Sequence, residues 1–235
     1  MNLQKYFEVR KGTVPVILSC PHGGFLIPKN IPDKLKGVQI ADKNKFIISK
    51  RIIQVLQEMF GIEIYYILSK IHRSKVDFNR PPRAFSAFNH NSNRAREIHK
   101  IYHQKIKTFY QECVDRFGKC LFIDLHGFTK PHKNYPDIIF GNIFGNTLKI
   151  CHDSDFWGFT EIVNELLSEF TLDDGLGMSN FNLAYSGGYI THKFYKRSQC
   201  NAFQIEVAKY IRENIALTNI FVEKITKALN ISLKD

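Results

Sequence analysis

Long apolar runs are absent from this sequence of 235 residues. No stretch approaches the roughly 18 consecutive apolar residues that a membrane-spanning helix needs. The N-terminal residues MNLQKYFEVRK also lack the apolar core of a secretory signal peptide. These absences predict a cytoplasmic protein without a membrane segment.

Paired cysteines are absent as well. The five cysteines stand at positions 20, 113, 120, 151 and 200, and no Cys-x-x-Cys pair occurs among them. An odd number at wide spacing disfavours both a disulfide framework and a cysteine zinc knuckle. We therefore expect reduced and mostly buried thiols.

Acidic residues are too few to balance the basic ones. The chain has 33 Lys and Arg against 22 Asp and Glu, a formal net charge of +11. The basic residues are scattered, with no Lys/Arg-rich block and no aromatic-glycine signature of an RNA-binding sheet, so this charge supports nucleic-acid binding only weakly. An acidic substrate or a lysine-rich solubilising surface explains it better.

The residues that are present suit one α/β domain. Hydrophobic residues make up 44% of the chain, enough for a sizeable core. Short β-branched or aromatic runs bounded by Gly, Pro, Asn or Asp predict strands at 14–20, 62–69, 120–125, 137–141 and 202–207. Apolar residues three or four apart predict helices at about 46–60, 98–117, 155–170 and 217–231.

Alternating strands and helices predict a three-layer α/β sandwich with a mixed, mostly parallel sheet. The sequence has no internal repeat and no low-complexity linker, so we expect a single domain over residues 1–235. The polar stretch 81–94 is predicted to be a long surface loop.

Functional groups in such sheets gather beyond the carboxyl ends of the strands. His22 follows the first predicted strand, and His126 ends the third. Neutral imidazole is the commonest metal ligand, so this pair favours a metal site over a plain polar cap of each strand. Asp124 points the same way as His126 and can orient its imidazole. Asp42 is the best candidate for a third ligand by position, although an N-cap role in the next helix is equally open.

The segment HRSKVDFNR, residues 72–80, gathers cations and an amide. Arg80 can grip a carboxylate bidentately with Asn79 as a further donor, and Arg73 can contact a polarised carbonyl oxygen. A solvated basic loop is the alternative. Glu206 lies inside an apolar strand, where an unpaired carboxylate costs several kcal/mol. It therefore needs a cation, a metal or a catalytic role.

Six segments, taken in order, resemble the motifs of the N-formylglutamate amidohydrolase family. They are SCPHGGFLIP (19–28), HRSKVDFNRPP (72–82), YHQKI (102–106), FIDLHGF (122–128), NLAYSGGYITHKFY (182–195) and FQIEVAKYIRE (203–213). The resemblance covers residues from about 14 to 213. It implies the phosphorylase/hydrolase-like fold shared with zinc carboxypeptidases, aspartoacylases and zinc-dependent cell-wall amidases.

By this resemblance, His22 and His126 match the first and last histidine ligands of one zinc ion. Asp42 occupies the place where cell-wall amidases carry an acidic ligand, whereas the His-x-x-Glu of carboxypeptidases is absent because residue 25 is Phe. Glu206 looks like the general base.

The same resemblance assigns the substrate contacts. Asn79 and Arg80 look like the pair that holds the terminal carboxylate, and Arg73 looks like the carbonyl-polarising arginine. His103 matches a family position, with a plain role on the helix flank as the alternative. Tyr189 follows two glycines in a turn that could close over the pocket, or that could be an ordinary turn.

Two positions depart from the family pattern, because Gly23 and Gly127 stand where members commonly carry serine. This difference bears on the substrate more than on the chemistry. The implied activity is zinc-dependent hydrolysis of the amide bond of a small anionic N-acyl amino acid, similar to N-formylglutamate. The alternatives are a zinc peptidase or cell-wall amidase, and a non-catalytic basic binding module on the same fold.

Overall fold

The strands pair into one mixed sheet. The computed structural model describes residues 3–149 and 156–234. Its described part contains a seven-stranded sheet in the order β1-β3-β2-β4-β7-β5-β6. The strands are β1 (Phe7–Arg10), β2 (Val16–Cys20), β3 (Tyr65–Ser69), β4 (Cys120–Phe128), β5 (Ile138–Gly141), β6 (Leu172–Asp173) and β7 (Cys200–Ala208). The central strands β3, β2, β4 and β7 are parallel, whereas β1 pairs with β3 and β5 with β7 in antiparallel fashion.

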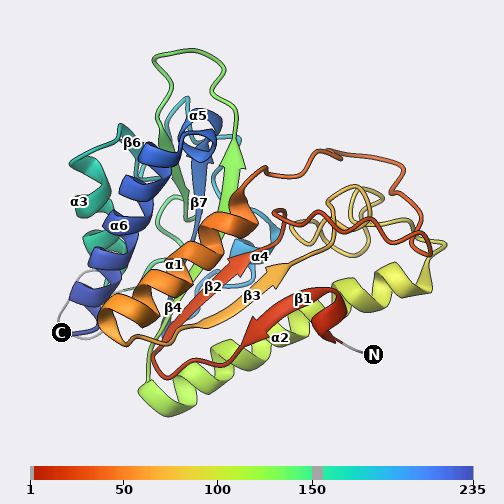
Figure 1. The fold of residues 1–235 in the computed structure, drawn as a ribbon, viewed down its shortest axis with the longest axis horizontal. Helices are drawn as coiled ribbons and strands as arrows, with labels where there is room; N and C mark the ends of the chain where they lie inside the picture. Colours follow the sequence, from red (N-terminus) through yellow and green to blue (C-terminus); the bar gives the residue numbers. More distant parts are fainter. Residues whose placement is uncertain (1–2, 150–155, 235) are drawn as a thin grey trace.

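Helices cover both faces of this sheet (Figure 1). The longer ones are α1 (Lys45–Phe60), α2 (Asn93–Phe117), α3 (Phe159–Leu167) and α6 (Ile215–Ser232). Three short elements are η1 (Leu3–Lys5), α4 (Tyr189–His192) and α5 (Lys209–Glu213). Helices α1, α3 and α6 lie on one face and α2 on the other, which confirms the predicted three-layer α/β fold.

Each face of the sheet has its own apolar core. Val16 and Leu18 of β2 belong to the core under α1 and α6, whereas Ile17 between them belongs to the core under α2. Successive side chains of a strand point to opposite faces, so a strand covered on both sides must be apolar throughout. That requirement explains the continuous apolar runs in the sequence.

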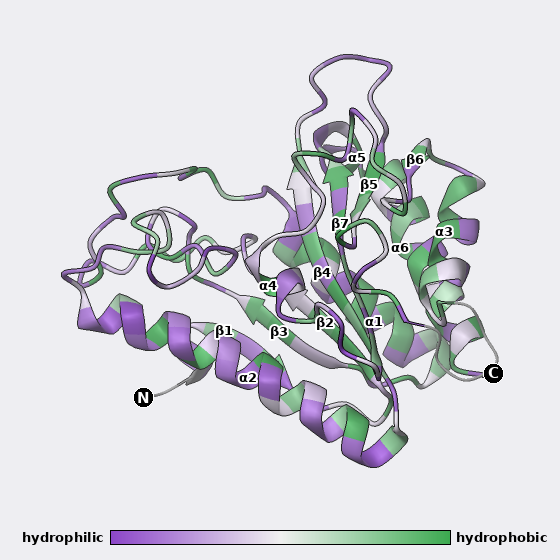
Figure 2. Ribbon diagram, turned by 180° about the vertical axis from the view of Figure 1, so that it is seen from behind, coloured by the Kyte–Doolittle hydropathy of each residue, from purple (hydrophilic) through white to green (hydrophobic). Residues whose placement is uncertain are grey.

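Helix α2 is amphipathic over its whole length. Its buried residues recur mostly three or four positions apart, and Figure 2 shows hydrophilic residues in purple alternating with hydrophobic ones in green along the helix. The Ser92 side chain accepts a hydrogen bond from the Ala95 backbone N–H at the start of the helix. Gly118 ends it with a left-handed backbone, the usual way to terminate a helix.

The five predicted strands are confirmed as β2, β3, β4, β5 and β7. Strands β1 and β6 were not predicted, because they are short strands at the two sheet edges. Helices α1 and α6 match their predictions to within two residues, whereas α2 begins at Asn93, five residues before the predicted start. Of the helix predicted for 155–170, residue 155 lies outside the described residues, and α3 is shorter, from Phe159 to Leu167. The loop predicted for 81–94 ends earlier because α2 begins at Asn93.

Two predictions concern the environment of the protein. Four cysteines, at positions 20, 113, 120 and 200, are buried and form no disulfide among the described residues, as predicted, whereas Cys151 lies outside the described residues. Within the described part of the chain, no helix is long and apolar enough to cross a membrane.

The parallel strands bring distant residues to the same edge of the sheet. His22 follows the end of β2, and His126 lies near the end of β4. Glu206 of β7 is the direct register partner of His126, and Asp124 pairs with Ser19 of β2. Side chains from three strands therefore meet at this edge.

Candidate metal centre and substrate pocket

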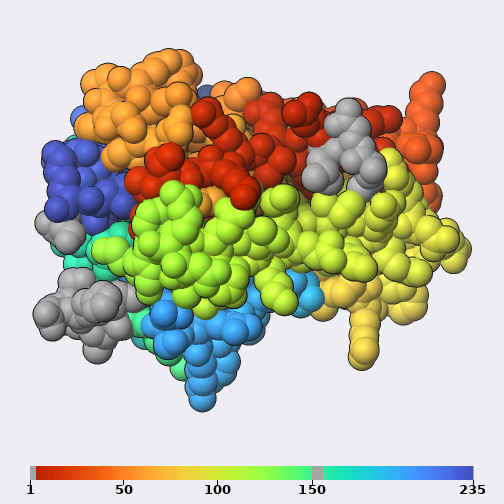
Figure 3. All heavy atoms as spheres, turned by 90° about the horizontal axis from the view of Figure 1, so that it is seen from below, coloured from red at the N-terminus to blue at the C-terminus, as the bar shows by residue number. Residues whose placement is uncertain are grey.

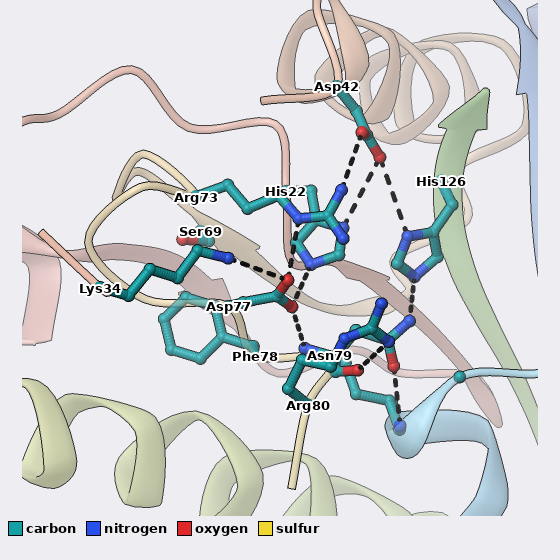
Figure 4. A network of polar contacts seen from close by, with 12 residues as sticks. His22, Lys34, Asp42, Ser69, Arg73, Asp77, Phe78, Asn79, Arg80 and His126 are labelled. Atoms are coloured by element: carbon teal, nitrogen blue, oxygen red, sulfur yellow. Dashed lines mark hydrogen bonds and ion pairs between the residues drawn. The ribbon is translucent and has the colours of Figure 1, made fainter. Parts of the chain in front are cut away.

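His22, Asp42 and His126 form a buried cluster (Figure 4). The Nδ1 atoms of the two histidines lie 3.7 and 3.8 Å from the same oxygen, Asp42 Oδ2. The potential ligand atoms of the three residues lie within 4.8 Å of one another. Two imidazoles and one carboxylate are a donor set typical of a catalytic divalent-metal site with three protein ligands.

Asp42 does not cap the helix that follows it. The N-cap position of α1 belongs to Asn44, and the Asp42 side chain turns towards the histidines. Its Oδ2 atom also accepts a hydrogen bond of 3.1 Å from the Gly127 backbone N–H. The carboxylate is thereby fixed between β2 and β4.

A carboxylate holds the other ring nitrogen of each histidine. His22 Nε2 lies 2.7 Å from Asp77 Oδ1, and His126 Nε2 lies 2.8 Å from Asp124 Oδ2. A carboxylate that accepts a hydrogen bond from Nε2 leaves the Nδ1 lone pair available to a metal. His22 Nδ1 is buried and has no hydrogen-bond partner among the described residues. Both histidines thus turn Nδ1, the nitrogen that would bind a metal, towards Asp42.

Asp77 is the main functional residue that sequence reasoning missed. Besides His22, it accepts hydrogen bonds from Asn79 N at 3.0 Å and from Arg73 Nε at 2.9 Å, and Lys34 Nζ lies 3.4 Å away. Burial alone would raise the pKa of Asp77, but His22, Arg73 and Lys34 hold it well below its usual value. The sequence offered one signal for Asp77, because this carboxylate lies between two apolar residues in the segment 72–80.

The charges of the cluster are strongly coupled. Burial would lower the pKa of His126, but the carboxylates of Asp124, Glu206 and Asp42 together outweigh it and raise that pKa to about 9. Burial would raise the pKa of Asp42, but His22, His126 and Arg73 lower it to about 2. Without a bound cation, His126 is therefore protonated and Asp42 ionised at neutral pH.

Glu206 lies beside this cluster. Its side chain is buried, its Oε1 atom is 3.4 Å from Gln204 Nε2, and its Oε2 atom has no hydrogen-bond partner among the described residues. Burial raises the pKa of Glu206, although the nearby His126 opposes the shift. A buried carboxylate with a raised pKa and a free oxygen is suited to take up a proton.

Arg73, Asn79 and Arg80 lie in the turn that follows β3. Arg73 has two acidic partners. Its Nε atom contacts Asp77, and its Nη1 atom lies 3.7 Å from Asp42 Oδ1. Asn79 Nδ2 is 3.3 Å from His126 Nε2, and Asn79 Oδ1 accepts a hydrogen bond from Ile190 N at 3.0 Å. The guanidinium of Arg80 donates to the Asn79 carbonyl oxygen at 3.2 Å. Arg80 forms no ion pair with any described residue, so its charge is available to an anion.

His103 and Tyr189 lie on the outer side of that turn. His103 Nε2 donates to the Phe78 carbonyl oxygen at 3.0 Å, and its ring centroid is 5.2 Å from that of Tyr189. An added Cβ at Gly188, which precedes Tyr189, would collide with the Asn79 side chain. The glycines of this turn therefore let α4 pack against Asn79. Neither His103 nor Tyr189 belongs to the histidine and carboxylate cluster.

Gly127 makes room for a buried arginine. A Cβ at this position would lie 2.5 Å from Arg212 Nε. Arg212 donates to three backbone carbonyl oxygens, those of Val207, Lys43 and Phe128, at 3.0, 2.7 and 3.1 Å. The arginine thus ties the ends of β4 and β7 to the chain that enters α1. Close packing against Arg212 is a physical reason for glycine at 127.

Comparison with protein families matches residues 86–211, just over half of the chain, to the N-formylglutamate amidohydrolase family. Two solved structures have a similar fold. An N-formylglutamate amidohydrolase from Ralstonia eutropha JMP134 has a TM-score of 0.69 at 13% identity, covering 97% of this chain and 98% of that chain. A gene product from Agrobacterium tumefaciens has a TM-score of 0.64 at 17% identity, covering 98% and 96%. No curated protein matches the sequence.

Proposed function

Because the chain belongs to the N-formylglutamate amidohydrolase family, we propose that it is a metal-dependent enzyme that hydrolyses the amide bond of a small, anionic N-acyl amino acid. One observation carries the proposal: two histidines whose Nε2 atoms are held by carboxylates converge with Asp42 beside the buried carboxylate of Glu206. Residues 1–235 would form a single amidohydrolase domain.

The metal would be one zinc ion held by His22, Asp42 and His126. The unpartnered His22 Nδ1 atom and the mixed nitrogen and oxygen donor set support this choice. When bound, zinc supplies Lewis-acid chemistry, lowering the pKa of water and polarising a carbonyl group. Asp77 and Asp124 would keep both imidazoles in the ligating orientation.

Glu206 would act as the general base and then as the general acid. Its carboxylate takes a proton from the attacking water and returns it to the leaving amine. Gln204 lies 3.4 Å from one of its oxygens, and the other has no hydrogen-bond partner in the part of the chain that the structure describes, so it would be open to proton transfer. Its burial favours the protonated form between the two steps.

The substrate would be recognised by its charge. Arg80 has no acidic partner among the described residues, so its planar fork can bind a carboxylate bidentately. Asn79 adds an amide donor next to His126. The Arg73 Nε–H is fixed by Asp77, which would aim the rest of its guanidinium at the carbonyl oxygen that becomes negative in the transition state.

The proposal is tested by metal analysis combined with a substrate panel. The purified protein should contain one zinc per chain and should release glutamate from N-formylglutamate or a related N-acyl amino acid. His22→Ala and His126→Ala should each lose both metal and activity. Full metal content in both variants, or no hydrolysis of any N-acyl amino acid by the zinc-loaded protein, would refute the assignment. Cleavage of peptides or of muramoyl-alanine amides alone would indicate the peptidase or cell-wall amidase alternative.

A further inference from the structure

A groove runs along α2 on the opposite side of the sheet from α1 and α6. It lies between one side of α2 and the segment 189–197, which Figure 3 shows side by side in yellow-green and light blue. Its volume is about 810 Å³. Cavities that bind ligands usually range from about 300 to 1,000 Å³.

The lining of the groove is basic. Arg96, Lys100 and Lys107 of α2 face Lys193 and Arg197 of the opposite wall, and no acidic residue of the described chain belongs to the lining.

The five cations of the groove are uncompensated. None of them forms an ion pair with a described acidic residue, whereas Arg94, elsewhere on α2, pairs with Glu97 at 3.1 Å. Opposed rows of cations in a concave site raise the local concentration of anions. The groove therefore selects a ligand with several negative charges.

The aromatic rings of the groove are engaged by neighbouring side chains. The Phe194 ring is stacked on Phe122 at 4.4 Å and meets the edge of Tyr110 at 5.7 Å. Lys193 Nζ lies 4.5 Å from the centre of the Tyr189 ring. Sequence-tolerant binding of single-stranded nucleic acid uses exposed rings on which bases stack. This lining does not supply them.

Phosphate is also a poor fit for the groove. Phosphate sites typically use helix N-termini and backbone N–H groups, whereas the groove follows the flank of α2 from Arg96 to Gln111 and is lined along this length by side chains. Lysine ammonium groups with apolar stems, Ile106 on the floor and the Gln104 amide instead suit carboxylates carried on a peptide.

The length of the groove sets the size of the ligand. From Arg96 to Gln111 the helix rises by about 22 Å at roughly 1.5 Å per residue. An extended peptide covers that length with about six or seven residues at roughly 3.3 Å each. We propose that this groove is a binding site for a short acidic peptide, separate from the metal centre.

The groove is separated from the metal centre by the turn that carries Arg80. His99 lines the groove and donates from Nε2 to the Arg80 carbonyl oxygen at 3.0 Å, and Pro82 lines the same end. The groove therefore lies on the outer side of the turn, and His22, Asp42 and His126 do not line it. This assignment does not depend on the proposed hydrolysis.

The test is fluorescence anisotropy with the whole protein and a fluorescein-labelled hexaglutamate. Saturable binding is expected, weakening as salt is added, whereas labelled hexaglutamine should not bind. The double variant K100E/K107E should raise the Kd at least about tenfold, because two favourable charge contacts become repulsive. K100R/K107R keeps the charges and should bind as the wild type does.

A matched control changes the same number of charges outside the groove. Arg51 on α1 and Lys234 beyond α6 are exposed, so R51E/K234E should change the Kd less than about threefold. If both double variants lost affinity for hexaglutamate equally, the net charge of the protein would explain the binding, and the proposed site would be overturned. Absence of saturable binding would overturn it as well.

Competition identifies the ligand and the site. Displacement of hexaglutamate by a thymidine hexanucleotide or by tripolyphosphate at lower concentration than unlabelled hexaglutamate would overturn the peptide assignment. Displacement by N-formylglutamate would place the peptide in the substrate pocket and overturn the separate site. Hydrolysis of N-formylglutamate, if the protein performs it, should be the same in K100E/K107E and wild type.

Discussion

Metal binding to this centre should be strongly coupled to the protonation of His126. With its pKa raised to about 9 by the carboxylates of Asp124, Glu206 and Asp42, the metal-free imidazole must lose a proton before it can act as a ligand. The two pH units between 7 and 9 correspond to about 3 kcal/mol, or roughly a hundredfold in affinity. Zinc affinity should therefore rise about tenfold per pH unit up to pH 9 and level off above it.

Asp124→Asn removes the largest of the charges that raise the pKa of His126 and keeps the shape of the side chain. Burial then dominates and lowers the pKa of His126, so the affinity of the variant should be nearly flat between pH 7 and 9. It should also bind zinc about 10- to 100-fold more weakly at pH 9, because the imidazole is less well oriented.

Titration calorimetry in two buffers of different ionisation enthalpy measures the protons released. The wild type should release about one proton more than Asp124→Asn at pH 7.5. Equal proton release and parallel pH profiles in the two proteins would refute the linkage and the assignment of His126 as a ligand.

Three further substitutions separate catalysis, recognition and packing. Glu206→Gln should retain zinc and the unfolding temperature while turnover falls roughly 10²- to 10⁴-fold; a destabilised variant with near wild-type turnover would contradict the role as base. Arg80→Lys keeps the charge but loses the planar fork, so kcat/KM for a carboxylate substrate should fall at least about tenfold, and equal activity on the neutral amide analogue would remove the role. Gly127→Ala crowds Arg212 and should lower the free energy of unfolding by about 1–3 kcal/mol in denaturant titrations. Gly177→Ala adds its methyl group to open space and is the matched control, so equal destabilisation of both would count against the packing argument.

The central strands and the positions of the histidines could be predicted from local sequence. A parallel strand covered on both faces needs a continuous apolar run, and polar residues directly after such runs must lie at one sheet edge. His22 and His126 each follow such an apolar run, so both were expected at that edge. The same reasoning placed Asp124 on the face of β4 that carries His126, and the structure puts 2.8 Å between their side chains.

Contacts between separate segments could not be predicted from local sequence. Asp77 reaches His22 across 55 positions, and nothing local to either residue encodes that pairing. The sequence was equally consistent with Asp42 as a helix cap and with Asp42 as a metal ligand. In the structure, Asn44 occupies the N-cap position of α1. Short edge strands such as β6, with two residues, carry too little pattern to be recognised.

The polar interior of the site has an energetic cost that packing alone does not explain. His22 Nδ1, Asp124 Oδ1 and Glu206 Oε2 are buried without hydrogen-bond partners among the described residues, and each such atom typically costs about 1–3 kcal/mol. The fully buried Lys45 does not offset this, because burial lowers its pKa well below the usual value and disfavours its charged form. A cation bound by His22 and Asp42 would turn one unpaired atom into a ligand and bring positive charge to the carboxylates. A bound cation would therefore offset part of the cost of keeping these groups buried.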